Sequence, residues 1–374
     1  MSSVSPLGSN LKEVWANYIS PNHNLSEITY NEQLTWVGKI NDSNLEVLET
    51  VKQSDALFRK LDPTVLMAVM VSRKAFTESG WSNTSEIGVN FGSSRGATSL
   101  FEKYHKTFIS QKSTPTLTSP TTTLGNISSW VAHDLMLKGP DISHSITCST
   151  ALHALLNGVA WIQSGMTKKF IVGGSEAPLT DFTVAQMKAL KIYASKENKY
   201  PCQALNADKK SNSMVLGEGA AAVCLEEGVN PKRLAQIIGI GYATEILEHN
   251  VSLSTEGNCF KTSMLNAMKN IDINDVDVIV THTPGTIKGD QSELNAIKSI
   301  FKNNTPALTC NKWKIGHSLG ASGMLSLEMA ILMLQNQQFI ATPFTTYESP
   351  KKIEKLLVNA VGFGGNAVSI LLSK

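Results

Sequence analysis

Residues 142–165, ISHSITCSTALHALLNGVAWIQSG, decide how the rest of the chain is interpreted. The stretch predicts a short strand, a tight turn at Cys148 and an apolar helix that begins at once. At the start of a helix, free backbone N–H groups and the helix dipole favour negative charge, which lowers a thiol pKa and enriches the nucleophilic thiolate. Cys148 is therefore a candidate nucleophile, although a free cysteine is more often a small buried hydrophobic residue.

The bulk composition is that of a globular protein with no electrostatic reason to bind nucleic acid. The chain has 374 residues, of which 42% are hydrophobic, and a formal net charge of +2. Its five cysteines are odd in number and none are spaced C-x-x-C, which argues against a disulfide framework and a zinc site. The first residues do not resemble a signal peptide, and no stretch predicts a membrane span. We therefore expect a cytoplasmic protein.

Alternating strand and helix patterns predict the α/β class, with helices covering the sheets. The Ser-, Thr- and Pro-rich residues 109–126 are expected to form an ordered loop within one domain. Helices are expected at 11–19, 44–51, 63–79, 97–106, 128–137, 184–190, 262–271 and 318–334. Strands are expected at 86–91, 169–173, 214–226, 235–240 and 277–280.

Two pairs of segments look alike across the chain. Strand 277–280 leads into THTPGT as strand 86–91 leads into GSSRG, and the helix after His317 is as apolar as the helix after Cys148. A helix that is apolar all round is buried, so both helices belong to the core. The pattern indicates two duplicated halves, residues 1–230 and 231–374, divided at Pro231.

Two histidines stand in strand-end contexts similar to that of Cys148. His282 follows the apolar run VDVIV, and His317 directly precedes the second apolar helix. A lone histidine in such a position is usually a satisfied core or turn residue. His153, five residues after Cys148 on the same helix, points away from the thiol and is expected to be structural.

Six motifs follow one another in a family order. The chain resembles the β-ketoacyl-[acyl-carrier-protein] synthases of the thiolase superfamily in TCSTALHA (147–154), VGGSEAPLT (172–180), VLGEGAAAVCLE (215–226), HTPGTIKGDQSE (282–293), NKWKIGHSLGASG (311–323) and NAVGFGGNA (359–367). The resemblance covers nearly the whole chain. It implies a thiolase-like fold in which two duplicated α/β halves pack as a layered α-β-α-β-α core.

The resemblance also implies a reaction and its groups. Cys148 would accept an acyl group from a carrier thioester, and the backbone N–H groups of Cys148 and Phe363 would form the oxyanion hole. His282 and His317 would stabilise the enolate left when a malonyl thioester loses CO₂. No metal or organic cofactor is needed.

Further positions match the family pattern. Lys312 matches the family's active-site lysine, and Glu293 matches the acidic partner of that lysine. Phe363, between glycines, matches a gating residue. Thr286 matches a threonine that binds the pantetheine arm. Without the resemblance, Lys312 followed by Lys314 would be read as a solvated loop. The implied partners are an acyl carrier protein and a second subunit, in a homodimer or in a heterodimer with a related chain.

Departures from the family pattern favour a specialised polyketide, polyene or fatty-acid pathway. Pro284 replaces an expected threonine, Trp313 places a large ring near the site, and SNSM at 211–214 replaces R-D-G-F. The chain starts where the family has a first strand, so that strand is expected to be missing, either because the given start is late or because this edge of the sheet is truncated. The alternative function is a non-catalytic chain-length-factor subunit, although such subunits characteristically lack the nucleophile.

Overall fold

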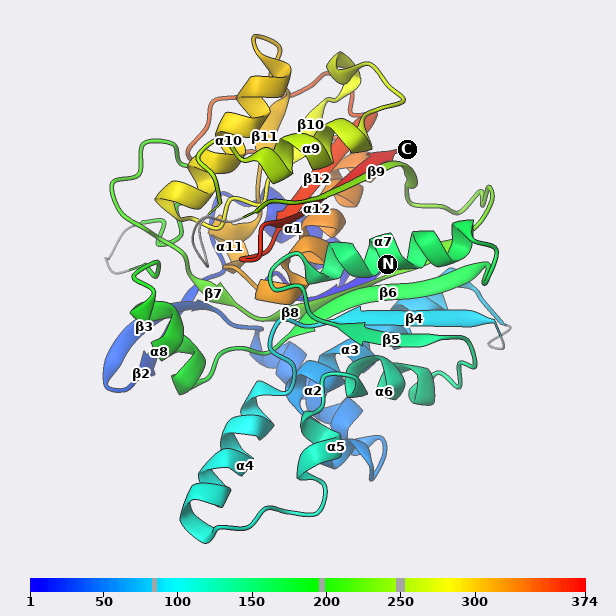
Figure 1. The fold of residues 1–374 in the computed structure, drawn as a ribbon, viewed down its shortest axis with the longest axis vertical. Helices are drawn as coiled ribbons and strands as arrows, with labels where there is room; N and C mark the ends of the chain where they lie inside the picture. Colours follow the sequence, from blue (N-terminus) through cyan, green and yellow to red (C-terminus); the bar gives the residue numbers. More distant parts are fainter. Residues whose placement is uncertain (83–85, 195–198, 247–252) are drawn as a thin grey trace.

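The computed structural model describes residues 1–82, 86–194, 199–246 and 253–374. Two five-stranded sheets dominate it (Figure 1). The first sheet has the order β1-β8-β6-β4-β5, formed by β1 (Ser2–Val4), β4 (Ile87–Gly92), β5 (Asp141–His144), β6 (Lys169–Glu176) and β8 (Gly219–Glu226). The second has the order β11-β10-β12-β13-β9, formed by β9 (Gln236–Thr244), β10 (Val278–Val280), β11 (Ala307–Thr309), β12 (Lys355–Val361) and β13 (Asn366–Ser373).

The two sheets repeat one topology. When the five strands of each sheet are taken in chain order, corresponding strands hold the same place in the two sheets. The corresponding pairs are β1 and β9, β4 and β10, β5 and β11, β6 and β12, and β8 and β13. Strand directions match as well, with three parallel strands at one end and two antiparallel pairings at the other. The predicted likeness of strands 86–91 and 277–280 is confirmed, because β4 and β10 hold equivalent positions.

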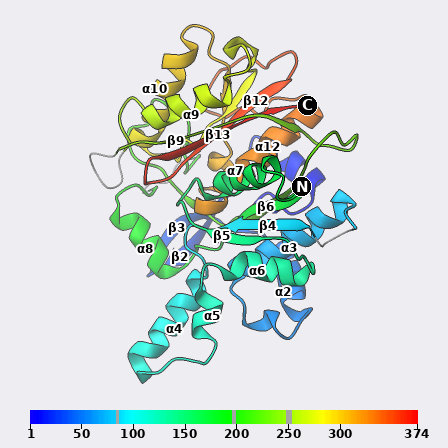
Figure 2. The ribbon, with the colours of Figure 1, turned by 45° about the vertical axis from the view of Figure 1, so that its right-hand side comes forward.

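Helices form three layers around the sheets. The helices α7 (Thr150–Gln163) and α12 (Ser322–Asn336) pack against each other between the sheets (Figure 2). The first sheet is covered outside by α3 (Pro63–Ser79) and α6 (Asn126–Asp134), and the second by α9 (Asn258–Ala267) and α10 (Ile287–Phe301). Every residue from 322 to 334 is buried, which is why this helix is apolar all round. The predicted α-β-α-β-α order is confirmed.

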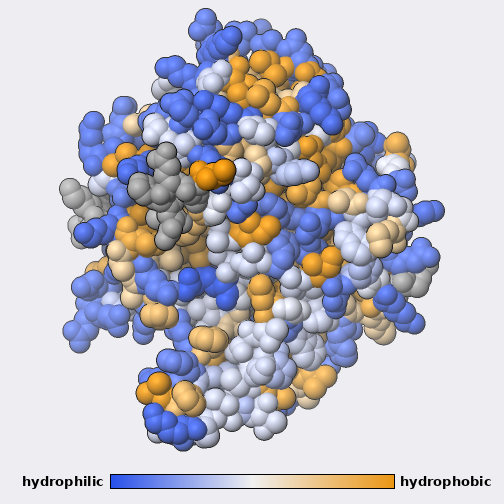
Figure 3. All heavy atoms as spheres, in the orientation of Figure 1, coloured by the Kyte–Doolittle hydropathy of each residue, from blue (hydrophilic) through white to orange (hydrophobic). Residues whose placement is uncertain are grey.

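The remaining helices of the described chain lie around these layers. Two of them, α4 and α5, project from the body as an arm, and hydrophobic residues lie at its lower end (Figures 1 and 3). The exposed side chains on α4 include Phe101, Phe108 and Ile109. The elements are α1 (Leu11–Ile19), α2 (Asp42–Gln53), η1 (Phe58–Lys60), α4 (Thr98–Gln111), α5 (Thr118–Thr122), α8 (Asp181–Ala189), η2 (Ile273–Asp275), α11 (Lys312–Ile315) and η3 (Leu319–Ala321).

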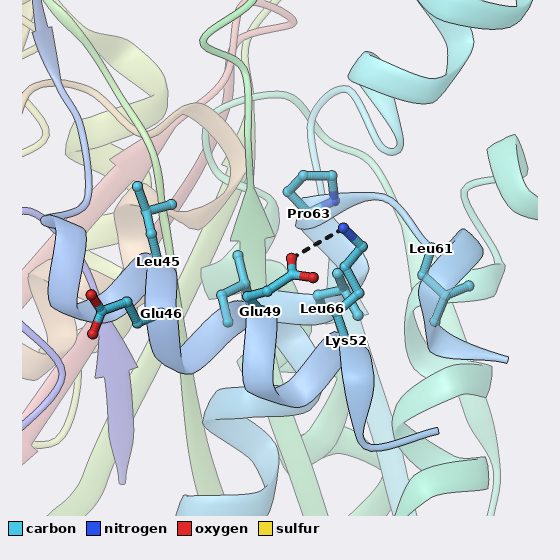
Figure 4. A pocket seen from close by; sticks show the side chains of 8 residues that line it. Leu45, Glu46, Glu49, Lys52, Leu61, Pro63 and Leu66 are labelled. Atoms are coloured by element: carbon cyan, nitrogen blue, oxygen red, sulfur yellow. Dashed lines mark hydrogen bonds and ion pairs between the residues drawn. The ribbon is translucent and has the colours of Figure 1, made fainter. Parts of the chain in front are cut away.

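A pocket of about 490 Å³ lies in the outer helical layer between α2 and α3 (Figure 4). Leucines and the Lys52–Glu49 ion pair, 3.1 Å long, line it together with Pro63. None of its residues belongs to the six motifs, so it is separate from the candidate site. Among the described residues, no helix is long and apolar enough to cross a membrane.

The predicted strand 214–226 is wrong as a single element. Residues 216–217 form β7, which pairs with β3 in a small sheet of β2 (Ser26–Tyr30), β3 (Gln33–Gly38) and β7 (Leu216–Gly217). The chain then passes to β8 through Gly219, whose φ of +152° is a conformation that side chains rarely allow. The hairpin β2–β3 was not predicted.

The expected absence of the first strand is also wrong. Ser2–Val4 pairs antiparallel with β8, with Ser2 opposite Ala222 and Val4 opposite Ala220. Three residues are too few to show a strand period, so pairing with β8 alone defines this edge. Residues 109–126 are ordered as expected but contain the end of α4 and the whole of α5. The other predicted helices are present with ends displaced by a few residues, which is where sequence patterns are least informative.

Candidate active site

The turn after β5 presents Cys148. Thr147 adopts a φ of +48°, and the Thr150 side chain holds the turn by accepting from Ile146 N at 2.8 Å and donating to Thr147 O at 2.5 Å. The helix α7 begins at Thr150 with Ser149 as its N-cap, so Cys148 lies just before the helix and not on its first turn. The thiol is buried, with 4% of the residue exposed.

Burial raises the pKa of Cys148 to about 12, and the charge of Glu176 adds to this effect while Lys312 opposes it. The predicted lowering of the thiol pKa is therefore wrong. Desolvation of a buried thiolate outweighs the attraction of a helix terminus, which is worth only a fraction of a pKa unit to about one and a half units. The resting thiol is protonated at neutral pH, and it must lose its proton as it attacks.

The structure brings His282 and His317 together. Their ring centroids are 5.3 Å apart and nearly perpendicular, at 81°. Burial, followed by the positive charge of Lys312, lowers the pKa of His317 to about 3. The same two causes, with a smaller contribution from His317, lower the pKa of His282 well below its usual value. Both imidazoles are consequently neutral at physiological pH, and each can donate one hydrogen bond.

Backbone contacts position the two histidines. His317 N donates to Val215 O at 2.7 Å, and Gly217 N donates to His317 O at 3.0 Å, which ties this turn to β7. Gly316 before it has a φ of +73°. The Nδ1 atom of His317 has no hydrogen-bond partner within the described part of the chain. This buried nitrogen therefore keeps an unused hydrogen-bonding capacity within those residues.

Lys312 is a cationic side chain whose charge acts on Cys148, His282 and His317. It is the first residue of α11 and is buried, and burial lowers its pKa. Its charge acts on the pKa of Cys148, His282 and His317, so all four residues share one buried site. The interpretation of 312–314 as a solvated loop is wrong, because both lysines are buried.

Glu293 and Lys312 interact through their charges, without a direct ion pair. The Glu293 carboxylate accepts from His282 N at 3.0 Å, Thr283 N at 2.9 Å and Asn359 Nδ2 at 3.0 Å. None of the ion pairs in the described residues joins it to Lys312. Glu293 therefore fixes the end of β10, from which His282 projects.

Lys314 is held by the backbone. Its Nζ donates to the carbonyls of Asn17, Ser20 and Asn22 at 2.9, 2.5 and 2.7 Å, and it lies 4.3 Å from the ring centre of Trp313. It thus joins the end of α1 to α11. Trp313 is buried beside Tyr200, with ring centroids 5.8 Å apart, directly next to Lys312 in the chain.

The predicted oxyanion-hole donor already has a partner. Phe363 N donates to Thr147 Oγ1 at 3.0 Å, and the neighbouring Gly362 packs so closely that a Cβ there would lie 2.1 Å from the same oxygen. The turn 362–365 therefore rests directly on the turn of Cys148. For Phe363 N to bind a substrate oxygen, it must first leave Thr147.

Thr286 caps a helix. It is the N-cap of α10, and its Oγ1 accepts from Gly289 N at 3.2 Å. Residues 211–214 still pack on this loop, because Ser213 N and Oγ both donate to Gly285 O at 2.9 Å. His153 is structural as expected for its position, with Nδ1 3.1 Å from Ser149 O.

Two sets of residues were not singled out from the sequence. Asp290 and Lys209 form a buried ion pair of 2.7 Å, and Asp290 also accepts from Gly285 N at 2.9 Å. Glu176 is buried and accepts from Ser93 Oγ, Ser94 N, Arg95 N and Gly320 N at 2.7–3.1 Å. An acidic residue inside the glycine-rich VGGSEA was a visible signal for the second set.

Donor sets for a metal are not found among the described residues: no group of three or more His, Cys, Asp or Glu is arranged to hold an ion. What the site offers is a buried thiol, two neutral imidazoles and one buried ammonium. These groups can carry out nucleophilic acyl transfer and stabilise an enolate.

Comparisons with known proteins agree with this geometry. Residues 1–230 match Beta-ketoacyl synthase, N-terminal domain, and residues 234–344 match Beta-ketoacyl synthase, C-terminal domain. A 3-oxoacyl-[acyl-carrier-protein] synthase 2 of Coxiella burnetii is 27% identical over 99% of this chain and 96% of its own length.

Solved structures share the fold. A ketosynthase complex described as a type II PKS acyl-carrier protein with its ketosynthase bound to the hexaketide has a TM-score of 0.86 at 18% identity, covering 99% of this chain and 97% of that chain. The ishigamide ketosynthase/chain length factor has a TM-score of 0.85 at 16% identity, covering 100% and 97%. The chain therefore has the thiolase-like fold and belongs to the beta-ketoacyl synthase family of condensing acyltransferases.

Proposed function

We propose that this protein joins an acyl group held on Cys148 to a malonyl thioester by decarboxylative Claisen condensation, giving a β-ketoacyl thioester on a carrier protein. The observation that carries the proposal is the pair of neutral imidazoles of His282 and His317, 5.3 Å apart and under the field of Lys312. A cysteine hydrolase would need one base oriented by Asn or Asp, and the second imidazole would have no role.

In the first half-reaction, the Cys148 sulfur attacks the thioester carbonyl. The carbon–sulfur bond to the carrier's pantetheine breaks, and the thiol proton leaves with the pantetheine sulfur. The N–H groups of Cys148 and Phe363 would bind the negative oxygen of the intermediate. This step requires Phe363 N to exchange Thr147 Oγ1 for that oxygen.

In the second half-reaction, the malonyl carboxyl group leaves as CO₂, and its bonding electrons remain on the adjacent carbon as an enolate. Hydrogen bonds from His282 and His317 to the thioester oxygen would stabilise this charge, and Lys312 adds a buried positive field. The carbon then attacks the acyl group on Cys148. The thiolate that is released takes up a proton from solvent.

The family and the neighbours support the expected partners. The relatives' names and one neighbour's title include an acyl carrier protein, and two other titles pair a ketosynthase with a chain length factor. We propose that this chain acts on carrier-bound substrates in the cytoplasm, as a homodimer or with a related subunit, in a polyketide, polyene or fatty-acid pathway. We also propose Thr286 as a pantetheine contact, and residue 231 as the start of the second half.

The alternative function is a non-catalytic chain-length-factor subunit. The retained Cys148 beside two histidines favours the enzyme. Incubation with a radiolabelled acyl-carrier thioester tests the choice: wild-type protein and Cys259→Ala, a buried cysteine on α9, should be labelled, and Cys148→Ala should not. The condensing-enzyme proposal fails if wild-type protein forms no adduct, or if Cys148→Ala is labelled equally.

A further inference from the structure

The loop between β4 and α4 lies against the turn of Cys148. A Cβ on Gly92 would lie 2.0 Å from Thr150 Cγ2, so the end of β4 touches the start of α7. Ser145 Oγ donates to Ser94 O at 3.2 Å, which joins the loop to the residues that lead to Cys148. The loop therefore lies next to the turn that carries the nucleophile.

Arg95 crosses from this loop to α8. Its backbone N donates to Glu176, and its Nη2 donates to Oε1 of Gln186 on α8. The residues Val184 and Met187 of α8 belong to the same apolar cluster as Cys148. The guanidinium therefore links the loop beside the nucleophile's turn to α8, the helix that contributes Val184 and Met187 to the apolar cluster of the thiol.

The charge of Arg95 is not compensated within the described part of the chain. None of the ion pairs between described residues involves Arg95. The nearby Glu176 carboxylate accepts hydrogen bonds from backbone N–H groups and a serine hydroxyl instead. The Nε atom of Arg95 is buried and has no hydrogen-bond partner. A buried donor on a charged group is unfavourable until an acceptor reaches it, and Nε with Nη2 forms a fork suited to oxygen.

We propose that Arg95 selects acyl groups that carry an oxygen acceptor, a ketone or a carboxylate, on the chain attached to Cys148. This inference rests on the proposed function. An unsubstituted alkyl chain would fill the apolar cluster but leave the Arg95 Nε–H unpaired and dry. An oxygenated chain supplies the missing acceptor, so the transition state for acyl transfer is stabilised for that class of substrate.

The experiment compares acyl groups of one length. Hexanoyl, 3-oxohexanoyl and adipoyl pantetheine thioesters are each incubated with the full chain, and the rate of Cys148 acylation is followed by mass spectrometry. Wild-type protein should prefer an oxygenated chain by roughly tenfold or more, the effect of one hydrogen bond to a charged group. Arg95→Met should abolish that preference. Arg95→Lys keeps the charge without the fork, so it should retain a preference for adipoyl only.

Each outcome separates the two proposals. If wild-type protein is acylated by none of the thioesters, the proposed function fails. If it is acylated but favours hexanoyl, or if Arg95→Met keeps the wild-type ratio, the role of Arg95 is refuted and the proposed function stands. If Arg95→Met does not fold, as judged by circular dichroism, the wild-type ratio and Arg95→Lys decide. A preference for 3-oxohexanoyl identifies a ketone, and one for adipoyl identifies a carboxylate.

Discussion

Glu328 on α12 offers a test of how burial sets stability. The residue is 0% exposed in the layer between the sheets, and neither carboxylate oxygen has a hydrogen-bond partner among the described residues. Burial raises its pKa from 4.5 to about 7, against the smaller opposing effects of the nearby Ser3 hydroxyl, the N-terminus and Lys74. The folded protein consequently holds a proton on Glu328 that the unfolded chain releases.

The sign of the pH dependence follows from proton binding. Between pH 4.5 and 7 the folded state binds more protons at Glu328 than the unfolded state, so the free energy of unfolding falls as the pH rises through this range. At about 1.4 kcal/mol for each pKa unit, the loss levels off at about 3 kcal/mol above pH 7. Glu328→Gln removes the titration. The variant should be more stable than wild type by about 3 kcal/mol at pH 8, and this advantage should vanish near pH 4.

Urea unfolding at a fixed protein concentration, from pH 4 to pH 8, measures this difference. Comparing the two proteins at each pH cancels the contributions of all other titrating groups. Glu46→Gln, at an exposed position on α2, is the matched control and should not show the same pH-dependent gain. A difference between wild type and Glu328→Gln that does not change with pH would refute the reasoning.

Three further variants test contacts of the site. Thr147→Val frees Phe363 N, so Cys148 should be acylated up to about fivefold faster, as expected for loss of one competing hydrogen bond. Thr147→Ser keeps the hydroxyl and should match wild type. Slower acylation of the valine variant would contradict the proposal that Thr147 competes with the substrate for Phe363 N. Glu293→Gln replaces a carboxylate that accepts from two backbone N–H groups at the end of β10. Malonyl decarboxylation, measured as CO₂ release, should fall roughly tenfold while acylation of Cys148 persists. Equal loss of both activities would contradict a role of Glu293 through His282. Lys314→Met leaves three partly buried carbonyls without their donor and should lower the free energy of unfolding by about 3 kcal/mol, measured in urea. An unchanged midpoint would contradict this expectation.

The regular part of the fold was predictable because it repeats. The two apolar helices predicted the middle layer, and α7 and α12 form it. Burial all round is confirmed for α12 only, because α7 has exposed residues at Ala160 and Gln163. The short edge strand β1 and the small sheet of β2, β3 and β7 were not predictable, since their partners come from distant residues. In these elements pairing, and not a local pattern, selects the extended conformation.

Residue types and spacing by themselves determined the candidates Cys148, His282 and His317, and the family resemblance added Lys312, because motifs preserve the chemical groups that a reaction needs. Only the tertiary structure decided their electrostatic state. Burial raises the pKa of the Cys148 thiol and lowers the pKa of both imidazoles. A pKa depends on how much water and which charges surround the group, and segments distant in the sequence determine both. The same reason applies to Thr147, Glu293 and Arg95. Their partners are brought near by packing between segments far apart in the chain.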